Sequence, residues 1–429
     1  MTGSTARVPA VGGGRTLPAP DPVAAAYLLL ALRLDQHLPG LVDGYLGPAD
    51  LKAQVDMEQL RQPARLREDA VGLRERVRAE VKDPVRRRWL DGQLGALEVQ
   101  SRALAGDPLP YQEHVAACFD FAPTRTPETV FEAAARALDG LLPGEGPLPG
   151  RIAAWDEAFT VPVERLPAMV DALLPRFRER AAGLFGLPEG EDLRVSLVRG
   201  QPWSGYNWYD GGLQSRVDLN VDLPVRAADL LAVLPHETYP GHHLEHACKE
   251  AQLVERDGLL EHAALLINAP ECLLSEGLAD LGRRFAVPAA DEEDLLVEAY
   301  RLAGLAIATD PPAARDAAGR QVAITRALTE VRGVAGNAAL LLHADGRSRD
   351  EVLAYLRRYL LSTPERAAKR LEFIEHPLWR TYVFVYFEGE RLLRRWLELV
   401  REEDRAARFG RLLREPFTPG AIVAELGEG

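Results

Sequence analysis

The stretch Leu231-Ala-Val-Leu-Pro-His236-Glu237-Thr-Tyr-Pro-Gly-His242-His243-Leu-Glu-His246 holds four of the nine histidines of this 429-residue chain, and an apolar helical run leads into it. Zinc binds neutral imidazole and carboxylate groups, and its catalytic sites use three protein ligands and keep the fourth position open. A glutamate directly after a ligand histidine lies beside the metal, where it can accept a proton from water. The pair His236-Glu237 therefore predicts a zinc site with Glu237 as its base.

The spacing of the later histidines departs from the zincin pattern H-E-x-x-H, because Pro240 stands one helical turn after His236. In a regular helix His243 would face the same way as His236, since seven residues turn through about 700°, but it would lie about 10.5 Å further along the axis. Two imidazoles that far apart cannot share a metal ion. Because Pro240 removes a helical hydrogen bond and Gly241 tolerates unusual dihedrals, we expect a bend or bulge that brings His242 to the metal. His243 is the other candidate for the second ligand. The competing interpretation of the whole segment is a surface helix whose clustered imidazoles bind metal only adventitiously.

A second segment, Cys272-Leu-Leu-Ser-Glu276-Gly-Leu-Ala-Asp280, places the Glu276 carboxylate 276 − 242 = 34 residues after His242, within a helical pattern. A following helix can deliver a third metal ligand in this way, although a glutamate near a helix start also interacts favourably with the helix dipole. Asp280 lies one turn beyond Glu276. It is placed to orient a ligand histidine through a hydrogen bond, whereas an exposed acidic residue is the ordinary alternative.

Taken together, H-E-T-Y-P-G-H-H and S-E-G-L-A-D resemble the paired motifs of the bacterial domain of unknown function 885 family, whose members are similar to helical gluzincin metallopeptidases. Two further segments resemble motifs of that family, Asp43-Gly-Tyr-Leu-Gly-Pro48 and Tyr386-Phe-Glu-Gly389. Leu278 departs from the family pattern, in which an aromatic residue usually follows E-G. The resemblance implies a set of roles: His236, His242 and Glu276 as zinc ligands, Glu237 as general base, and Tyr386 as a donor to the reacting oxygen.

The composition is that of an ordinary folded protein, with 47% hydrophobic and 27% charged residues. A net charge of −13 argues against nucleic acid or an anionic membrane as a partner. The three cysteines form no C-x-x-C pair, which favours a reducing cytoplasm. The apolar run Val23–Leu32 is too short to span a membrane, and we expect it to form a core helix.

Helical periodicity dominates from residue 21 onward, so the predicted fold is mostly α, metallopeptidase-like, with a small β-sheet beside the metal-binding helix. Period-two alternation predicts two strands, at 193–198 and 217–223, on either side of an aromatic and glycine-rich segment that either lines a pocket or turns a hairpin. The breaker cluster at 142–150 predicts a boundary. We therefore expect a flexible tail over 1–20, a helical lobe over 21–150 and a zinc-binding catalytic lobe over 151–429.

The sequence predicts a zinc-dependent hydrolase that acts on a peptide or small amide substrate. Two alternatives remain open at this level: a helical protein that binds metal or peptide without catalysis, and a metallohydrolase of a non-peptide substrate. We further expect an extended peptide to lie along an exposed edge of the strand Val217–Leu223, because sheet edges offer unpaired backbone groups.

Overall fold

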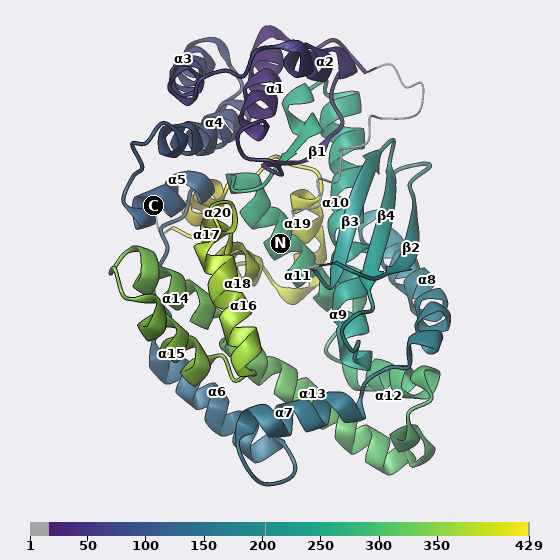
Figure 1. Cartoon of the computed structure of the whole chain (residues 1–429). Helices are drawn as coiled ribbons and strands as arrows, with labels where there is room; N and C mark the ends of the chain where they lie inside the picture. Colours follow the sequence, from purple (N-terminus) through teal and green to yellow (C-terminus); the bar gives the residue numbers. More distant parts are fainter. Residues whose placement is uncertain (1–16, 202, 428–429) are drawn as a thin grey trace.

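Helices make up most of the computed structural model, which describes residues 17–201 and 203–427. The predicted mostly α fold is confirmed, and two small sheets accompany the helices (Figure 1). Most of the predicted tail of residues 1–20 lies outside the described residues. None of the helices in the described part of the chain has the length and apolar character needed to cross a membrane.

The first helices form because apolar residues recur on one face of each and because clear start signals precede them. Helices α1 and α4 begin at prolines, and the side chains of Asp21 and Asp83 cap their free backbone amides. On α3 the residues Leu66, Ala70 and Leu73 form a buried face. The bounds in this region are α1 Pro22–Asp35, α2 Ala49–Met57, α3 Pro63–Glu80, α4 Pro84–Leu104 and α5 Tyr111–Phe119.

The N-terminal part of the chain is joined to the middle of the chain by a two-stranded antiparallel sheet. Strand β1 (Val42–Tyr45) pairs with β5 (Ala264–Leu266), and Val42 lies opposite Leu266. The helices that follow α5 and precede β5 in sequence are α6 Glu128–Leu141, α7 Leu148–Ala158, α8 Leu166–Phe185, α9 Ala227–Glu237 and α10 His242–Lys249. The predicted boundary at 142–150 covers the connection between α6 and α7 and the first residues of α7. The division into lobes stays a prediction.

The second sheet has three strands where the sequence predicted two. Strands β2 (Asp192–Val198), β3 (Gly205–Gly211) and β4 (Gln214–Asn220) stand in the order β2-β4-β3. The additional strand β3 is the aromatic and glycine-rich segment, whose rings suit a pleated surface. Strand β4 pairs with β2 on one side and with β3 on the other. The predicted exposed edge at Val217–Leu223 is therefore wrong, because β4 is the central strand and ends at Asn220.

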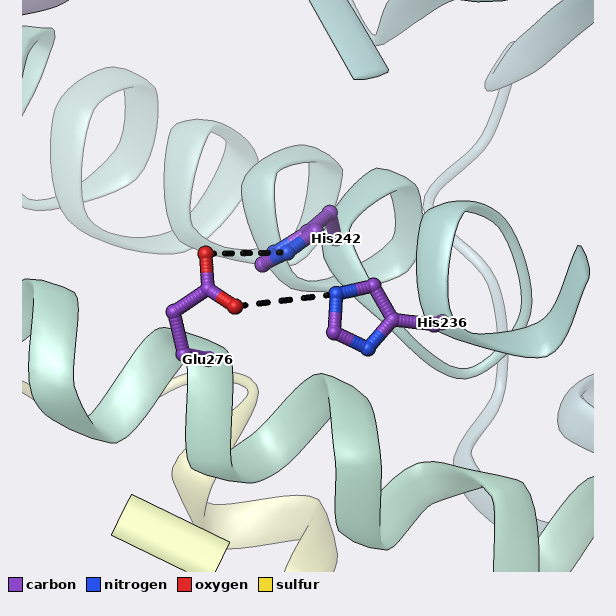
Figure 2. A group of neighbouring side chains, drawn as sticks. All are labelled: His236, His242 and Glu276. Carbon is purple, nitrogen blue, oxygen red and sulfur yellow. Dashed lines mark ion pairs between the residues drawn. The ribbon is translucent and has the colours of Figure 1, made fainter. Parts of the chain in front are cut away.

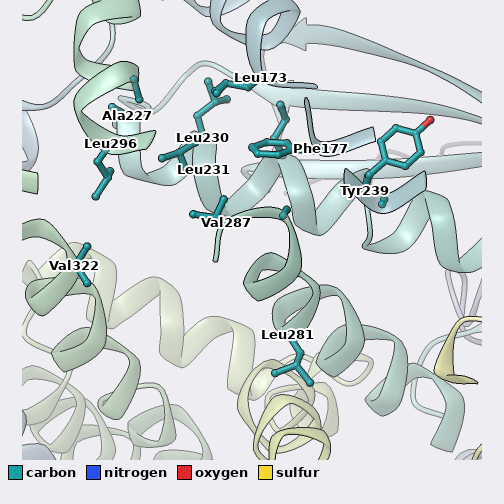
Figure 3. Packing of buried hydrophobic residues seen from close by; sticks show 14 of the residues in the cluster. Leu173, Phe177, Ala227, Leu230, Leu231, Tyr239, Leu281, Val287, Leu296 and Val322 are labelled. Atoms are coloured by element: carbon teal, nitrogen blue, oxygen red, sulfur yellow. The ribbon is translucent and has the colours of Figure 1, made fainter. Parts of the chain in front are cut away.

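The largest core packs α8, α9, α11 (Pro270–Ala286) and α12 (Glu292–Ala303) against one another. Figure 3 shows Phe177 of α8, Leu231 of α9, Leu281 of α11 and Leu296 of α12 within this cluster. The same cluster includes Val217 of β4. The sheet and the helix that carries His236 are thus fixed to one another by a shared apolar interior.

Helices α11 and α18 (Val385–Glu398) cross at two glycines. A Cβ atom on Gly389 would lie 2.0 Å from the carbonyl oxygen of Leu273, and one on Gly277 would lie 2.3 Å from the carbonyl carbon of Gly389. Only glycine allows so close a backbone approach. The crossing brings α18 against the helix that carries Glu276.

The remaining helices complete the C-terminal half, and α16 and α18 lie to the left of α9 in Figure 1, with the three-stranded sheet to its right. Their bounds are α13 Pro311–Glu330, α14 Gly333–His343, α15 Arg349–Tyr359, α16 Pro364–Glu375, α17 Trp379–Tyr382, α19 Arg405–Leu412 and α20 Pro419–Glu425.

Candidate metal centre

The predicted bend in the histidine segment is a complete break between two helices. Helix α9 ends at Glu237 and α10 begins at His242. The amide of Gly241 donates to the carbonyl of Pro235 at 3.0 Å, and a Cβ atom on Gly241 would lie 1.8 Å from the carbonyl oxygen of His236. The chain therefore folds back tightly on the end of α9, and this turn sets His242 beside His236.

Three side chains from three helices converge where the sequence predicted the metal ligands (Figure 2). Nε2 of His236 lies 3.7 Å from Oε2 of Glu276, and Nε2 of His242 lies 3.8 Å from Oε1 of the same carboxylate. One potential ligand atom from each residue lies within 4.8 Å of the others. The side chains are 20%, 13% and 16% exposed respectively, so the cluster is shielded but reachable from solvent.

His236 is oriented by a carboxylate on its other side. Its Nδ1 lies 3.1 Å from Oδ1 of Asp280, and Arg332 donates to Oδ2 of Asp280 at 2.7 Å. Burial disfavours the charged form of His236, but this hydrogen bond and the charges of Glu237 and Glu276 raise its pKa to about 9. The contact predicted for Asp280 is present, and it directs Nε2 of His236 toward Glu276.

His242 is held by a hydroxyl that belongs to a buried polar chain. Its Nδ1 lies 3.3 Å from Oγ of Ser275, and this hydroxyl donates to Glu245 at 2.6 Å. Glu245 accepts from Lys249 at 2.7 Å, and Lys249 also donates to Glu271 at 2.6 Å. Nε2 of His242 is thereby left to face Glu276.

The adjacent His243 lies in a different environment, which separates the two candidates for the second ligand. Its side chain is fully buried, with Nδ1 at 2.8 Å from the Ser215 hydroxyl and Nε2 at 2.8 Å from Glu191. Tyr239 and Arg178 donate to the same Glu191 carboxylate. Both ring nitrogens of His243 are occupied, so it joins α10 to the sheet and takes no place in the cluster.

Glu237 lies beneath the edge strand of the sheet. A Cβ atom on Gly205 would lie 3.1 Å from Oε1 of Glu237, and the side-chain amide of Asn207 donates to the Glu237 carbonyl at 2.8 Å. Burial raises the pKa of Glu237, while the neighbouring His236 and His242 act in the other direction. A carboxylate whose proton affinity is increased in this way is suited to accept a proton.

Two tyrosines line the side of the cluster formed by α17 and α18, and sequence reasoning singled out only one of them. The Tyr382 hydroxyl donates to Oε1 of Glu276 at 2.7 Å, and the rings of Tyr382 and Tyr386 lie 5.2 Å apart. Although Tyr386 is partly exposed, burial of its phenol and the negative charges of Glu276 and Glu237 raise its pKa. Tyr382 was missed because its helical spacing is equally typical of a core aromatic.

On the side of the cluster formed by the sheet strands, two residues from distant parts of the chain contact one another. The Tyr206 hydroxyl of β3 donates to Asp43 of β1, and burial together with the charges of Asp43, Glu237 and Glu276 raises the Tyr206 pKa. Asp43 belongs to the N-terminal motif noted above. The aromatic segment around Tyr206 therefore reaches the site, although no spacing in the sequence connects it to Asp43.

The donor set fits zinc. Two imidazole nitrogens and one carboxylate are ligands of catalytic zinc sites, and donors about 2.0–2.2 Å from a tetrahedral ion lie about 3.3 Å apart. The 3.7 and 3.8 Å separations between the imidazole nitrogens and the Glu276 oxygens need to contract by about half an ångström around such an ion, and all three ligand atoms lie within 4.8 Å of one another before any contraction. Each histidine also has its second nitrogen fixed by a neighbour, as ligand histidines do.

Comparisons with known proteins leave the family open. No family model matches the chain, and no curated protein matches it. The crystal structure of "the putative lipoprotein from Colwellia psychrerythraea" is similar at a TM-score of 0.48 and 13% identity, over 96% of this chain and 77% of that chain. This likeness is too low to carry an argument. The resemblance to the domain of unknown function 885 family stays a prediction, as do zinc and the catalytic roles.

Proposed function

We propose that this protein is a zinc-dependent hydrolase of peptide or amide bonds. The observation that carries the proposal is the convergence of His236, His242 and Glu276 from three helices onto one point. Glu237, which follows the first of these residues in the chain, is buried between the cluster and the sheet edge. A chance histidine pair on a surface helix would have neither the third ligand nor the oriented second nitrogens.

Each side chain has a definite part in such a reaction. A bound zinc ion supplies Lewis acidity, which polarises the amide carbonyl and acidifies water. Glu237 takes a proton from the attacking water and passes it to the leaving nitrogen. Tyr386 donates a hydrogen bond to the oxygen on which negative charge develops, and Tyr382 holds Glu276 in its ligand position.

The substrate class is proposed from the position of β3. This strand lies at the edge of its sheet and borders Glu237 through Gly205. An extended peptide can add to such an edge through backbone hydrogen bonds, with its scissile bond held near the base. We therefore assign the peptide-binding edge to β3, and no longer to the strand predicted at 217–223.

Replacing Glu237 with glutamine tests the proposed mechanism. Glu237→Gln keeps the size of the side chain but removes the proton acceptor, so zinc is expected to stay near one ion per chain while hydrolysis falls by about 10²- to 10⁴-fold. Metal analysis and mass spectrometry of a digested peptide library measure the two quantities. The exposed Glu145→Gln serves as the matched control and is expected to behave as the parent.

Two results would remove the assignment. Hydrolysis at the parental rate by Glu237→Gln would exclude its role as base. Undiminished zinc stoichiometry and affinity in both His242→Ala and Glu276→Gln would exclude the ligand set itself.

A further inference from the structure

Arg370 of α16 is a partly buried cation without an anionic partner. Among residues 17–201 and 203–427 it forms no ion pair and no hydrogen bond. Its guanidinium carbon lies 5.7 Å from the centre of the Phe373 ring. By contrast, Arg332, which also lies near Tyr386, is neutralised by Asp280 at 2.7 Å.

A continuous row of contacts places Arg370 on the tyrosine side of the metal cluster. The Phe373 ring lies 6.2 Å from the Tyr386 ring, and the Tyr386 ring lies 5.2 Å from that of Tyr382. Tyr382 then donates to Glu276. Arg370 is therefore within reach of a substrate that contacts Tyr386. Its helix, α16, lies on the other side of α9 from the three-stranded sheet (Figure 1).

The Arg370 guanidinium is partly withdrawn from water and has no counter-charge among the described residues, which disfavours its charged form. Burial lowers the pKa of Arg370, and the interaction with the Tyr386 phenol acts in the other direction. A charge removed from water without a counter-charge destabilises the fold, whereas an arriving carboxylate would gain a paired, hydrogen-bonded partner. Arginine suits this task because its planar fork can bind both carboxylate oxygens.

We propose that Arg370 binds a carboxylate group of the substrate, and so makes the enzyme prefer peptides that carry a carboxylate near the cleaved bond. The inference rests on the proposed function. The carboxylate has two sources, a free peptide C-terminus or an aspartate or glutamate side chain. The first would make the protein a carboxyl-terminal exopeptidase, and the second would make it selective for acidic sequences.

Three pools of N-acetylated tetrapeptides distinguish these sources. The first has free C-terminal acids and no acidic side chains, the second has the same sequences as C-terminal amides, and the third consists of amides with one glutamate. The rise in unfolding temperature of the zinc-loaded protein with peptide concentration gives an apparent dissociation constant for each pool. Mass spectrometry of the same mixtures records cleavage.

The parent is expected to bind the preferred carboxylate pool about 10- to 100-fold more tightly than the uncharged amide pool, which is the usual worth of charge-assisted hydrogen bonds. Arg370→Gln should abolish this preference, and Arg370→Lys should retain part of it. Arg366→Gln is the matched control, because Arg366 is an exposed arginine one turn earlier on α16. It should keep the full preference.

Equal binding of all pools by the parent, no binding of any pool, or a preference that survives in Arg370→Gln would each overturn the inference. Cleavage without a carboxylate preference would overturn it and leave the proposed function standing. A preference that depends on Arg370 without cleavage of any pool would support it and count against the proposed function.

Discussion

At the scale of single residues, the proposed ligands are distinct from the groups that hold them in place. His236 and His242 each use Nδ1 for a neighbouring side chain and present Nε2 to Glu276. Glu276 in turn accepts from Tyr382 on α17. Because each residue of the cluster has a supporting contact from another element, the geometry of the cluster depends on residues outside it.

The two tyrosines are expected to respond differently to loss of the hydroxyl. Tyr386→Phe should lower kcat by about 10²- to 10³-fold with little change in KM, because an oxyanion donor acts mainly in the transition state. Tyr382→Phe should weaken zinc binding by about 10- to 100-fold, because it removes the hydrogen bond that fixes Glu276. Steady-state kinetics and zinc titration against a chelator measure the two effects. If the two variants exchanged these effects, Tyr382 would be the donor to the oxyanion and Tyr386 the supporting residue.

The three residues of the cluster could be predicted from the sequence because short motifs contain them, but most of the side chains that contact them could not. The break at Pro240-Gly241 selects His242 over His243, and spacing alone left both open. The contact of Tyr206 with Asp43 joins residues 163 positions apart, so no local pattern records it. Motif spacing reports on neighbours in sequence, whereas the walls of this site come from pairings that only the folded chain creates.

At the scale of elements, the crossing of α11 and α18 determines where the tyrosines lie. Gly389→Ala would set a methyl group against the carbonyl of Leu273 and is expected to lower the free energy of unfolding by about 1–3 kcal/mol. Gly183→Ala on the exposed face of α8 meets no atom within 4 Å and is the matched control. It should raise the free energy of unfolding by about 0.5–1 kcal/mol.

Urea denaturation measures both values. If Gly389→Ala and the parent had the same free energy of unfolding, the close approach of α11 and α18 would not contribute to stability. The crossing would then not explain the position of the tyrosines.

The elements themselves were predictable to different degrees. The helices with regular apolar faces, such as α3, form as the sequence indicates. The aromatic segment was not recognised as strand β3, because its glycines resemble those of a loop and its partner β4 follows only after a turn. The order of strands in the sheet is set by tertiary packing, which explains why the exposed edge was assigned to the wrong strand.

At the scale of the whole molecule, stability is expected to depend on pH through His114. This side chain is buried, and burial together with the nearby Arg380 lowers its pKa to about 4. The unfolded chain, with a histidine pKa of about 6.5, binds more protons than the folded chain between these values, so stability falls as the pH falls below about 6.5. From pH 7 to pH 5 the contribution is about 2 kcal/mol.

His114→Gln removes this titration, so its free energy of unfolding should fall less than that of the parent over the same pH interval. Urea denaturation at both pH values provides the comparison. An identical fall in the two proteins would assign the acid sensitivity to other groups.

The pairing of β1 with β5 has a consequence for how the protein is made. Strand β1 leaves the ribosome long before its partner β5, because Val42 pairs with Leu266, which is synthesised much later. The Tyr382 hydroxyl that contacts Glu276 belongs to a residue made 106 residues after Glu276 itself. During synthesis His236, His242 and Glu276 are therefore present before the tyrosines that line one side of their cluster. Completion of the candidate site is a late, long-range event, which makes the order of translation part of its assembly.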